Sequence, residues 1–260
     1  MNWKIVVLKV EIPFCPLTGA WQTMTSNGSF TVPAGVTSLR VLCVGGGAGG
    51  AGVHWGGGGS GNVSSGTFTV TPGSVHTVTV GPVAAGGPGG DGYGPGAAGG
   101  SSAFGSLLSC SGGSAALSAQ GASGGSGGGA GCWYVCSGGF GGTNGADGQY
   151  ITGANSGFYA GGTGQGTFAP HFALFTQNTF SAGAGGAAVA NPWDAAGSGG
   201  GGVLMNGTGP SGQQGANALY SGRVVWGTGE EGGLADVTDS CPDGDAGGNG
   251  ASGLVYVSLL

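Results

Sequence analysis

Charged side chains are scarce in this chain of 260 residues. Ten residues are acidic and only four are basic, which gives a formal net charge of −6 at pH 7. The basic residues are Lys4, Lys9, Arg40 and Arg223. Proteins that bind nucleic acid or anionic membranes carry a basic patch, and four scattered cations do not make one. We therefore expect neither nucleic acid nor a membrane surface as a partner.

Long hydrophobic runs are also missing. The longest apolar run, residues 5–8, is flanked by lysines, whereas a membrane-spanning helix needs about 20 apolar residues. Residues 1–12 lack the small-residue cleavage site of a signal peptide, and Lys9 and Glu11 interrupt the place where its apolar region would continue. We expect no membrane insertion and no standard secretion signal.

Cysteine is sparse and scattered, unlike the framework of a small disulfide-rich domain. The six cysteines are Cys15, Cys43, Cys110, Cys132, Cys136 and Cys241. Cys132 and Cys136 could close a small loop or offer two metal ligands, but no second pair stands at zinc-like spacing. Most of the six are expected to be buried small hydrophobes, and the sequence leaves open whether any of them form disulfides.

Glycine, by contrast, makes up 70 of the 260 residues, several times its usual share. In two stretches it falls on every third residue, at Gly139, Gly142, Gly145 and Gly148, and at Gly244, Gly247, Gly250 and Gly253. Three residues per turn, with a rise of about 3.1 Å, define the polyproline II helix. Such a segment has no internal hydrogen bonds, so its buried N–H and C=O groups must pair with neighbouring segments. The spacing predicts a bundle of these helices with little side-chain core.

Strand patterns occur on both sides of the glycine-rich part. Residues 28–44 read as two strands around a Pro-Ala-Gly turn, with Phe30, Val32, Leu39, Val41 and Cys43 pointing inward. Residues 62–81 repeat this pattern around a Thr-Pro-Gly turn, with Phe68, Val70, Val75, Val78 and Val80. Residues 254–260 form another alternating strand. A small β layer is therefore expected, with both ends of the glycine-rich part tied to it.

The expected fold is all-β and irregular, with almost no α-helix. A small antiparallel β layer is joined to a glycine-rich polyproline II bundle with long displayed loops. The expected division is an N-terminal attachment segment at 1–24, a strand layer at 25–82 completed by 254–260, and the bundle at 83–253.

The sequence matches a dinucleotide-binding motif but lacks the features that such a site needs around it. Gly45, Gly47 and Gly50 spell GxGxxG directly after a strand. The residues that follow have poor helix propensity, and no acidic residue lies about 20 positions on to hold a ribose. The motif is therefore expected to result from the glycine content, and we expect no cofactor.

A hydrolase motif fails in the same way. Ser123 stands in a GxSxG within Gly-Ser low complexity, where a nucleophile elbow would need a strand-to-helix turn. His54, His76 and His171 are widely separated, and His76 is expected as a surface or satisfied histidine in a strand. We expect no enzymatic activity.

Acidic residues gather between positions 230 and 245. Asp239, Asp243 and Asp245 are weak calcium candidates, because hard cations bind several oxygen ligands. Their spacing does not match an EF-hand loop, and a solvated acidic loop that limits association explains them better. No metal site is assigned.

Several motifs together resemble the glycine-rich domain of bacteriophage tail-fibre proteins. They are residues 30–47 (FTVPAGVTSLRVLCVGGG), 68–73 (FTVTPG), 78–81 (VTVG), 100–105 (GSSAFG) and 250–258 (GASGLVYVS). The alternation of glycine runs with aromatic loops is also similar to the tail-fibre tip adhesins of T-even-type phages. In those proteins a polyproline II sandwich presents variable loops that bind a host receptor. The resemblance implies a receptor-binding role in a virion.

The aromatic inserts between the glycine runs are the candidate contact residues. Loops on a rigid scaffold commonly carry binding, and Trp and Tyr anchor sugars and proteins through a flat apolar face with a polar handle. About half of these side chains are expected to plug the ends of the bundle instead. The candidates for binding a receptor protein or glycan are Trp55, Tyr93, Trp133, Tyr134, Phe158, Tyr159, Phe172, Phe175, Trp193 and Tyr220.

The N-terminal segment is the candidate attachment site to a fibre or to a neighbouring chain. Residues 3–12 read as a strand that could add to a neighbour's sheet edge. The residues assigned to this contact are Trp3, Ile5, Val7 and Lys9.

Two other functions remain open. The chain could be a structural virion or extracellular fibre protein that self-assembles without receptor specificity. Ice-binding proteins also use polyproline II bundles, but they need a flat surface of small residues. The inserts at 149–160, 167–180 and 217–240 would interrupt such a plane.

Overall fold

The computed structural model describes a core region in full and several short strands by their backbone. The fully described residues are 20–51, 56–82, 84–87, 94–115, 117, 123–124 and 249–260. The strands described by backbone alone are β8 (Val135–Cys136), β9 (Ile151–Thr152), β10 (Gly157–Tyr159), β11 (Phe180–Ala182), β12 (Ala188–Asn191), β13 (Asp194–Gly197), β14 (Val203–Met205), β15 (Leu219–Tyr220) and β16 (Arg223–Trp226). Within these ranges the chain is all-β and contains no helix, and hence no helix that could cross a membrane.

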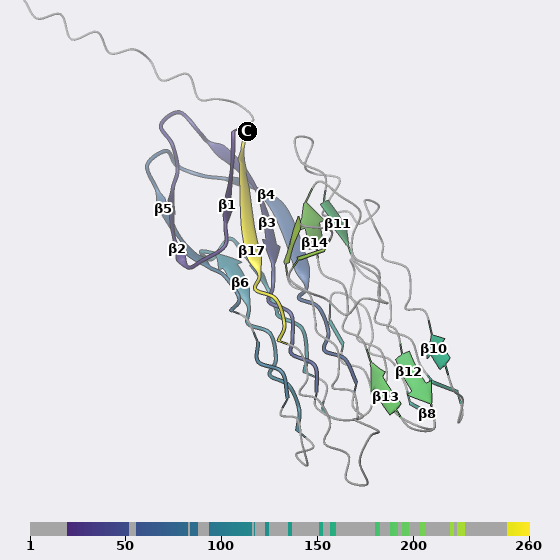
Figure 1. Ribbon diagram of the computed structural model, residues 1–260. Helices are drawn as coiled ribbons and strands as arrows, with labels where there is room; N and C mark the ends of the chain where they lie inside the picture. Colours follow the sequence, from purple (N-terminus) through teal and green to yellow (C-terminus); the bar gives the residue numbers. More distant parts are fainter. Residues whose placement is uncertain are drawn as a thin grey trace, which may run out of the picture.

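The first of two four-stranded antiparallel sheets has its C-terminal strand inside it. The strands are, in spatial order, β1 (Trp21–Met24), β17 (Leu254–Leu259), β3 (Ser38–Val44) and β4 (Val63–Thr69). β17 pairs with β1 on one side and with β3 on the other (Figure 1). The expected closing strand at 254–260 is confirmed, and the last four residues of the expected attachment segment belong to β1.

The second sheet packs against the first. Its strands are, in spatial order, β2 (Gly28–Thr31), β5 (Val75–Thr79), β6 (Ser102–Phe104) and β7 (Leu108–Cys110). Each predicted strand pair is divided between the two sheets, because β2 and β3 lie in different sheets, as do β4 and β5. The segments between β2 and β3 and between β4 and β5 are therefore not hairpin turns within one sheet. Each is a corner that leads the chain from one sheet to the other.

Both corners depend on a glycine with left-handed backbone. Gly35 has a φ of 82° and Gly73 a φ of 81°, a region that other residues rarely adopt. The corners also bind each other, since the Gly73 N–H donates to the Val32 carbonyl at 2.9 Å and the Val32 N–H donates to the Ser74 carbonyl at 2.9 Å. The turn residues recognised in the sequence thus hold the two sheets together at one end.

The inner faces of the sheets form one apolar core. Alternation along the strands buries most of the predicted inward residues, namely Phe30, Val32, Leu39, Val41, Cys43, Val70, Val78 and Val80, while Phe68 is partly buried against them. Val75 was predicted to point inward, and this is wrong because its side chain is 63% exposed. Val75 lies three positions from Val78, so the alternation places it on the opposite face, and His76 occupies the inner face instead.

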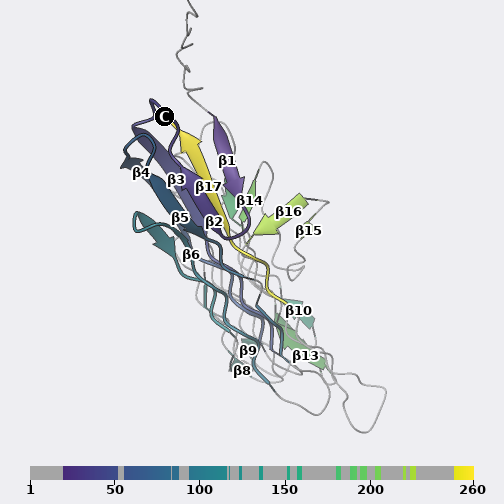
Figure 2. The same ribbon diagram turned by 90° about the vertical axis from the view of Figure 1, so that its left-hand side faces the viewer.

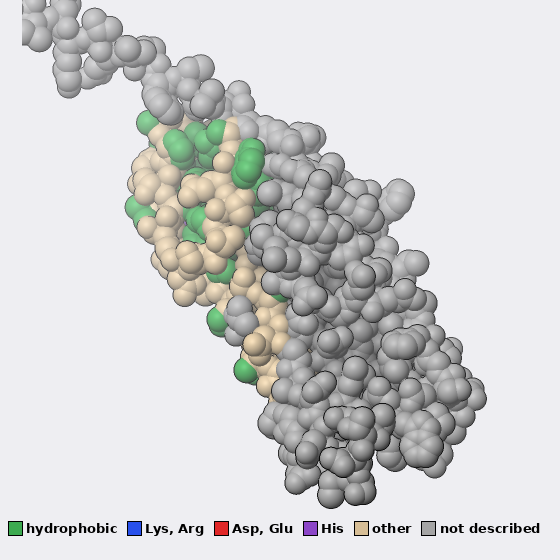
Figure 3. All heavy atoms as spheres, viewed as in Figure 1, with side chains coloured by type: hydrophobic (Ala, Val, Ile, Leu, Met, Phe, Trp, Pro, Cys, Tyr) green, Lys and Arg blue, Asp and Glu red, His purple; other side chains and the backbone are tan. Residues whose placement is uncertain are grey.

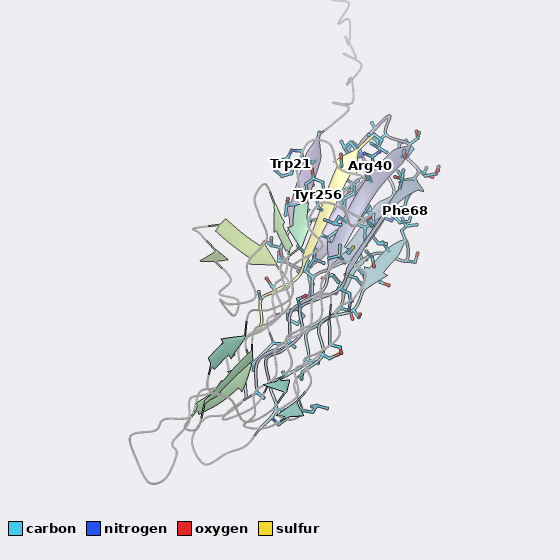
Figure 4. The ribbon with its side chains drawn as sticks, turned by 90° about the vertical axis from the view of Figure 1, so that its right-hand side faces the viewer. Trp21, Arg40, Phe68 and Tyr256 are labelled. Atoms are coloured by element: carbon cyan, nitrogen blue, oxygen red, sulfur yellow. The ribbon has the colours of Figure 1, made fainter. Side chains whose placement is uncertain are left out.

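The first sheet is buried on its outer face as well. Leu42, Val44, Leu254 and Tyr256 alternate with the core residues and are fully buried. β11 and β14 lie on this side of the sheet in both views (Figures 1 and 4). Strands buried on both faces read as continuous apolar runs, which matches residues 41–44 and 254–257.

Glycine-rich segments continue from the ends of the sheets and lie side by side (Figure 2). The segment at 45–51 follows β3, and 56–62 returns to β4. The segment that begins at Gly81 follows β5, and 94–100 returns to β6. Residues 249–253 lead into β17. None of these segments is a β-strand, so we call them together the glycine layer.

Successive backbone N–H groups of residues 45–49 donate to three neighbouring segments in turn. In chain order the donors and acceptors are Gly45 to Asn62, Gly46 to Gly100, Gly47 to Ala251, Ala48 to Gly59 and Gly49 to Ala97, at 2.8–3.0 Å. The same neighbour is therefore met again three residues later. This segment is surrounded by backbone from the other segments, which satisfies its polar groups without a regular sheet.

Glycine is required here because the backbones come too close for any side chain. A Cβ built on any of several glycines would collide with a backbone carbonyl of another segment, as at Gly45, Gly49, Gly59, Gly96, Gly99, Gly112, Gly113 and Gly250. Backbone atoms cannot turn aside as a flexible side chain can. The glycine content therefore follows from the spacing of the segments in this layer.

Ser102 connects the two sheets to the glycine layer. Its buried hydroxyl donates to the Val44 carbonyl at 2.6 Å and accepts from the Gly81 N–H at 2.9 Å. Val44 ends β3 and Gly81 begins a glycine-rich segment after β5. One side chain thus ties together the points at which both sheets pass into the layer.

Substitution of Gly49 by alanine tests the close approach. The new Cβ would meet the backbone carbonyl of Ala85, so Gly49→Ala should destabilise the fold by about 1–3 kcal/mol. Gly28→Ala is the matched control, because a Cβ at Gly28 meets nothing within 4 Å. Urea unfolding of both variants measures the difference, and equal stability of the two would contradict the tight packing of the layer.

The core thiol of Cys43 makes stability depend on alkaline pH. A hydrogen bond with the side chain of Cys110, and then burial, raise the pKa of Cys43 above its ordinary value. The unfolded chain ionises this thiol above about pH 8.5 while the folded chain keeps the proton. Stability of the reduced protein should therefore fall by about 1.4 kcal/mol per pH unit beyond that point.

The measurement is urea unfolding at pH 7 and pH 9.5 under reducing conditions. Cys43→Ala is the comparison, because it removes this titrating group and leaves every other one in place. The slope attributable to Cys43 is the difference between the two chains. If both chains lose the same stability between the two pH values, the buried thiol makes no contribution.

Candidate functional site

Most of the predicted contact residues lie outside the described residues. This holds for Trp55, Tyr93, Trp133, Tyr134, Phe172, Phe175 and Trp193, for the attachment residues Trp3, Ile5, Val7 and Lys9, and for the calcium candidates Asp239, Asp243 and Asp245. Phe158 and Tyr159 lie in β10 and Tyr220 in β15, where only the backbone is described. The location of the candidate site is therefore inferred from the described residues next to these positions.

Two of the chain reversals in the glycine layer begin and end next to each other. The Ala51 N–H donates to the Gly56 carbonyl at 3.4 Å, so the chain reverses between these two residues. The Gly87 N–H donates to the Gly50 carbonyl at 2.8 Å, and a Cβ on Gly96 would meet the Gly49 and Gly50 backbone. The reversals at 52–55 and 88–93 thus start from one place, at the end of the layer far from the sheets.

This geometry brings together the chain positions that flank Trp55 and Tyr93. The two aromatic residues stand 38 positions apart in the sequence (93 − 55). In both views β10, which contains Phe158 and Tyr159, lies toward the same end of the molecule (Figures 1 and 2). β15, which contains Tyr220, lies toward the sheets instead. We call the end marked by residues 50–56 and 87–94 the distal end.

The described side chains carry almost no charge. Of the Lys, Arg, Asp and Glu residues, only Arg40 lies among them, and the face seen in Figure 3 shows no charged atom in its described part. Contacts made by this part of the molecule must therefore come mainly from apolar surface, hydroxyl groups and backbone. Such contacts are less sensitive to salt than ion pairs are.

Trp21 is an exposed aromatic residue that the sequence did not single out. Its ring is 48% exposed and stacks on Tyr256 of β17, with centroids 5.6 Å apart and planes at 23° (Figure 4). Trp21 stood within the segment predicted as an attachment arm, and the four residues of β1 show no clear alternation. The strand register, which pairs Thr23 with Tyr256 and Trp21 with Ser258, is what places the ring there.

His76 is partly buried and packs against the core, as expected for a satisfied histidine. Its ring stacks on Phe104 with centroids 5.0 Å apart, and its Nε2 lies 3.2 Å from the Ser74 hydroxyl. A hydrolytic triad would also need an acid that orients the histidine, and no Asp or Glu side chain occurs in the described part of the chain. Nowhere in those ranges do three His, Cys, Asp or Glu side chains gather closely enough to hold a metal ion.

Backbone N–H groups of the GxGxxG motif already donate hydrogen bonds within the glycine layer. A pyrophosphate would need the backbone N–H groups after β3 and a helix N-terminus. The N–H groups of Gly45 and Gly47 donate to backbone carbonyls of Asn62 and Ala251, and the motif runs into an extended segment. The expectation that this motif results from glycine content agrees with this geometry.

Comparison with known protein families places this chain. The family model described as a glycine-rich domain matches residues 23–260, which is nearly the whole chain and includes both sheets and the glycine layer. A comparison with curated proteins finds none that is similar.

Replacement of Trp21 separates a structural role from a binding role at this sheet edge. Trp21→Ala removes the ring that stacks on Tyr256 and should cost about 1–2 kcal/mol of stability. Gln22→Ala, an exposed neighbour on the same strand, should change stability by less than about 0.5 kcal/mol. Urea unfolding of the two variants makes the comparison, and a Trp21 variant as stable as the Gln22 variant would show that the stacking adds nothing.

Proposed function

The chain belongs to the glycine-rich domain family, and from the resemblance of its motifs to those of tail-fibre proteins we propose that it is a bacteriophage tail-fibre adhesin that binds a host cell-surface receptor through displayed loops. The scaffold is a bundle of polyproline II helices. Two observations support the scaffold: the hydrogen-bond partners of 45–51 recur every third residue, and glycine stands where backbones touch. Three residues per turn is the period of the polyproline II helix.

The arrangement of the distal end is the observation that carries the receptor-binding role. Two reversals with an aromatic residue each, Trp55 and Tyr93, start from hydrogen-bonded backbone that is held in place by several neighbours. A rigid base lowers the entropy that loops lose on binding. Aromatic side chains supply contact area without charge. This suits a scaffold whose described side chains include a single Lys, Arg, Asp or Glu residue, Arg40.

The remaining parts of the proposal concern partners and location. The protein is a non-enzymatic component of the virion, and it acts outside the host cell. Residues 3–12 attach it to the fibre or to a neighbouring chain by adding a strand to an exposed sheet edge. The alternative is a structural virion or extracellular fibre protein that self-assembles through the same segment and has no receptor.

Binding to bacterial cells by the purified full chain tests the proposal. The labelled protein is titrated onto a panel of bacterial strains, and it should bind one strain or a few related ones. Trp55→Ala with Tyr93→Ala should weaken this binding at least about 30-fold, because central aromatic contacts are commonly worth 2 kcal/mol or more. Raising the salt from 50 to 500 mM should change the affinity little, because Asp91 is the one Lys, Arg, Asp or Glu residue in the sequence of the two reversals, 52–55 and 88–93.

Val75→Ala is the control for loss of an exposed apolar side chain. Val75 is 63% exposed on the second sheet, away from the distal end, and its removal should leave cell binding unchanged. Unchanged binding by the double aromatic variant would refute the role of the distal end. If no strain binds the chain and the protein polymerises with rising concentration, and deletion of residues 1–16 prevents this, the structural alternative is correct.

A further inference from the structure

Two cysteines face each other inside the sandwich. Cys43 lies on β3 of the first sheet and Cys110 ends β7 of the second. Cys43 is fully buried and Cys110 is 6% exposed, and both belong to the same core cluster. Their side chains are joined by a hydrogen bond, so the two sulfur atoms are neighbours although 67 positions separate them in the chain (110 − 43).

The chemistry of this pair is restricted by what surrounds it. Metal sites built on thiolates need further Cys, His or carboxylate ligands, and the described residues offer no group of three. The other neighbours of the pair are apolar core residues and the backbone of Phe104, which hydrogen-bonds to the Cys43 side chain. Two adjacent thiols without a third ligand have one characteristic reaction, which is oxidation to a disulfide.

We propose that Cys43 and Cys110 form a disulfide that cross-links the two sheets when the chain folds in the presence of a disulfide oxidant. The thiolate of one cysteine attacks oxidised glutathione and releases one glutathione thiolate, which leaves a mixed disulfide. The thiolate of the other cysteine attacks this mixed disulfide and releases a second glutathione. The protein loses two electrons and two protons, and the oxidant becomes two molecules of reduced glutathione.

The location of the pair determines when this reaction can take place. Inside the sandwich neither sulfur is accessible to a molecule the size of glutathione. The raised pKa of Cys43 also keeps its thiol protonated and unreactive when folded. Oxidation therefore takes place during folding, or when β7 separates, because this short edge strand pairs only with β6 in the second sheet.

The cross-link joins strands that have no backbone pairing with each other. β3 and β7 belong to different sheets, and each contributes a cysteine to the shared core. A bond at this point closes a long loop in the unfolded chain and so stabilises the folded state. The melting temperature should rise by roughly 5–15 °C relative to the reduced chain.

The test refolds the full chain with the other four cysteines changed to serine, so that only this pair can react. The substitutions are Cys15→Ser, Cys132→Ser, Cys136→Ser and Cys241→Ser. Refolding from denaturant with a glutathione redox buffer should yield a protein about 2 Da lighter than the reduced form, with one disulfide-linked peptide containing both cysteines. The folded reduced protein, exposed to the same buffer, should be oxidised at least tenfold more slowly.

The same mapping on the unsubstituted chain provides a measurement that does not depend on the serine variants. Cys110→Ala in the four-serine background is the matched control, and its melting temperature should not respond to oxidant. Recovery of both thiols in free form after oxidative refolding would overturn the proposal. A linked peptide with an unchanged or lower melting temperature would overturn the stabilising cross-link.

Discussion

The structure depends on the need of every buried backbone amide for a partner, in segments that cannot supply one internally. In the glycine layer each segment gives its N–H and C=O groups to several others, so no segment can hold its position alone. The partners are reached only because the backbones approach to distances that exclude a Cβ. The hydrogen bonding of these segments and their glycine content therefore follow from the same constraint, which is the close approach of the backbones.

The sandwich gives the layer its register. The segments of the layer emerge from strand ends, so the strand pairing between β3, β4 and β17 determines which glycine meets which carbonyl. Ser102 is the clearest example, because its hydroxyl donates to the last carbonyl of β3 and accepts from the amide of Gly81, two residues after β5. An ordered apolar core thus positions a layer in which backbone packs mainly against backbone.

Local patterns in the sequence predicted much of the sandwich and little of its topology. Alternation identified most of the inward residues, and the prediction for Val75 was wrong because it departed from alternation, which puts Val75 on the face opposite to Val78. The two turn motifs were found, but a turn alone does not say whether the strands beside it pair or separate into two sheets. That choice depends on distant partners such as β17, which lies far along the chain from β3.

The candidate site shows the same division between local and distant information. Aromatic inserts are visible as interruptions of the glycine pattern, so Trp55 and Tyr93 were named from the sequence. Their common origin at the distal end follows from hydrogen bonds such as that between Gly87 and Gly50, which no local pattern reveals. Trp21 was missed because its position depends on the register between β1 and β17.

The place of β17 in the middle of the first sheet has a consequence for biosynthesis. β1 and β3 both need β17 as their neighbour, yet the whole glycine-rich part is translated before it. Until then the strands made first have open edges and an incomplete core, which is the condition that favours aggregation or chaperone binding. A chain interrupted before residue 254 could not complete this sheet, so the native fold requires translation to continue through β17.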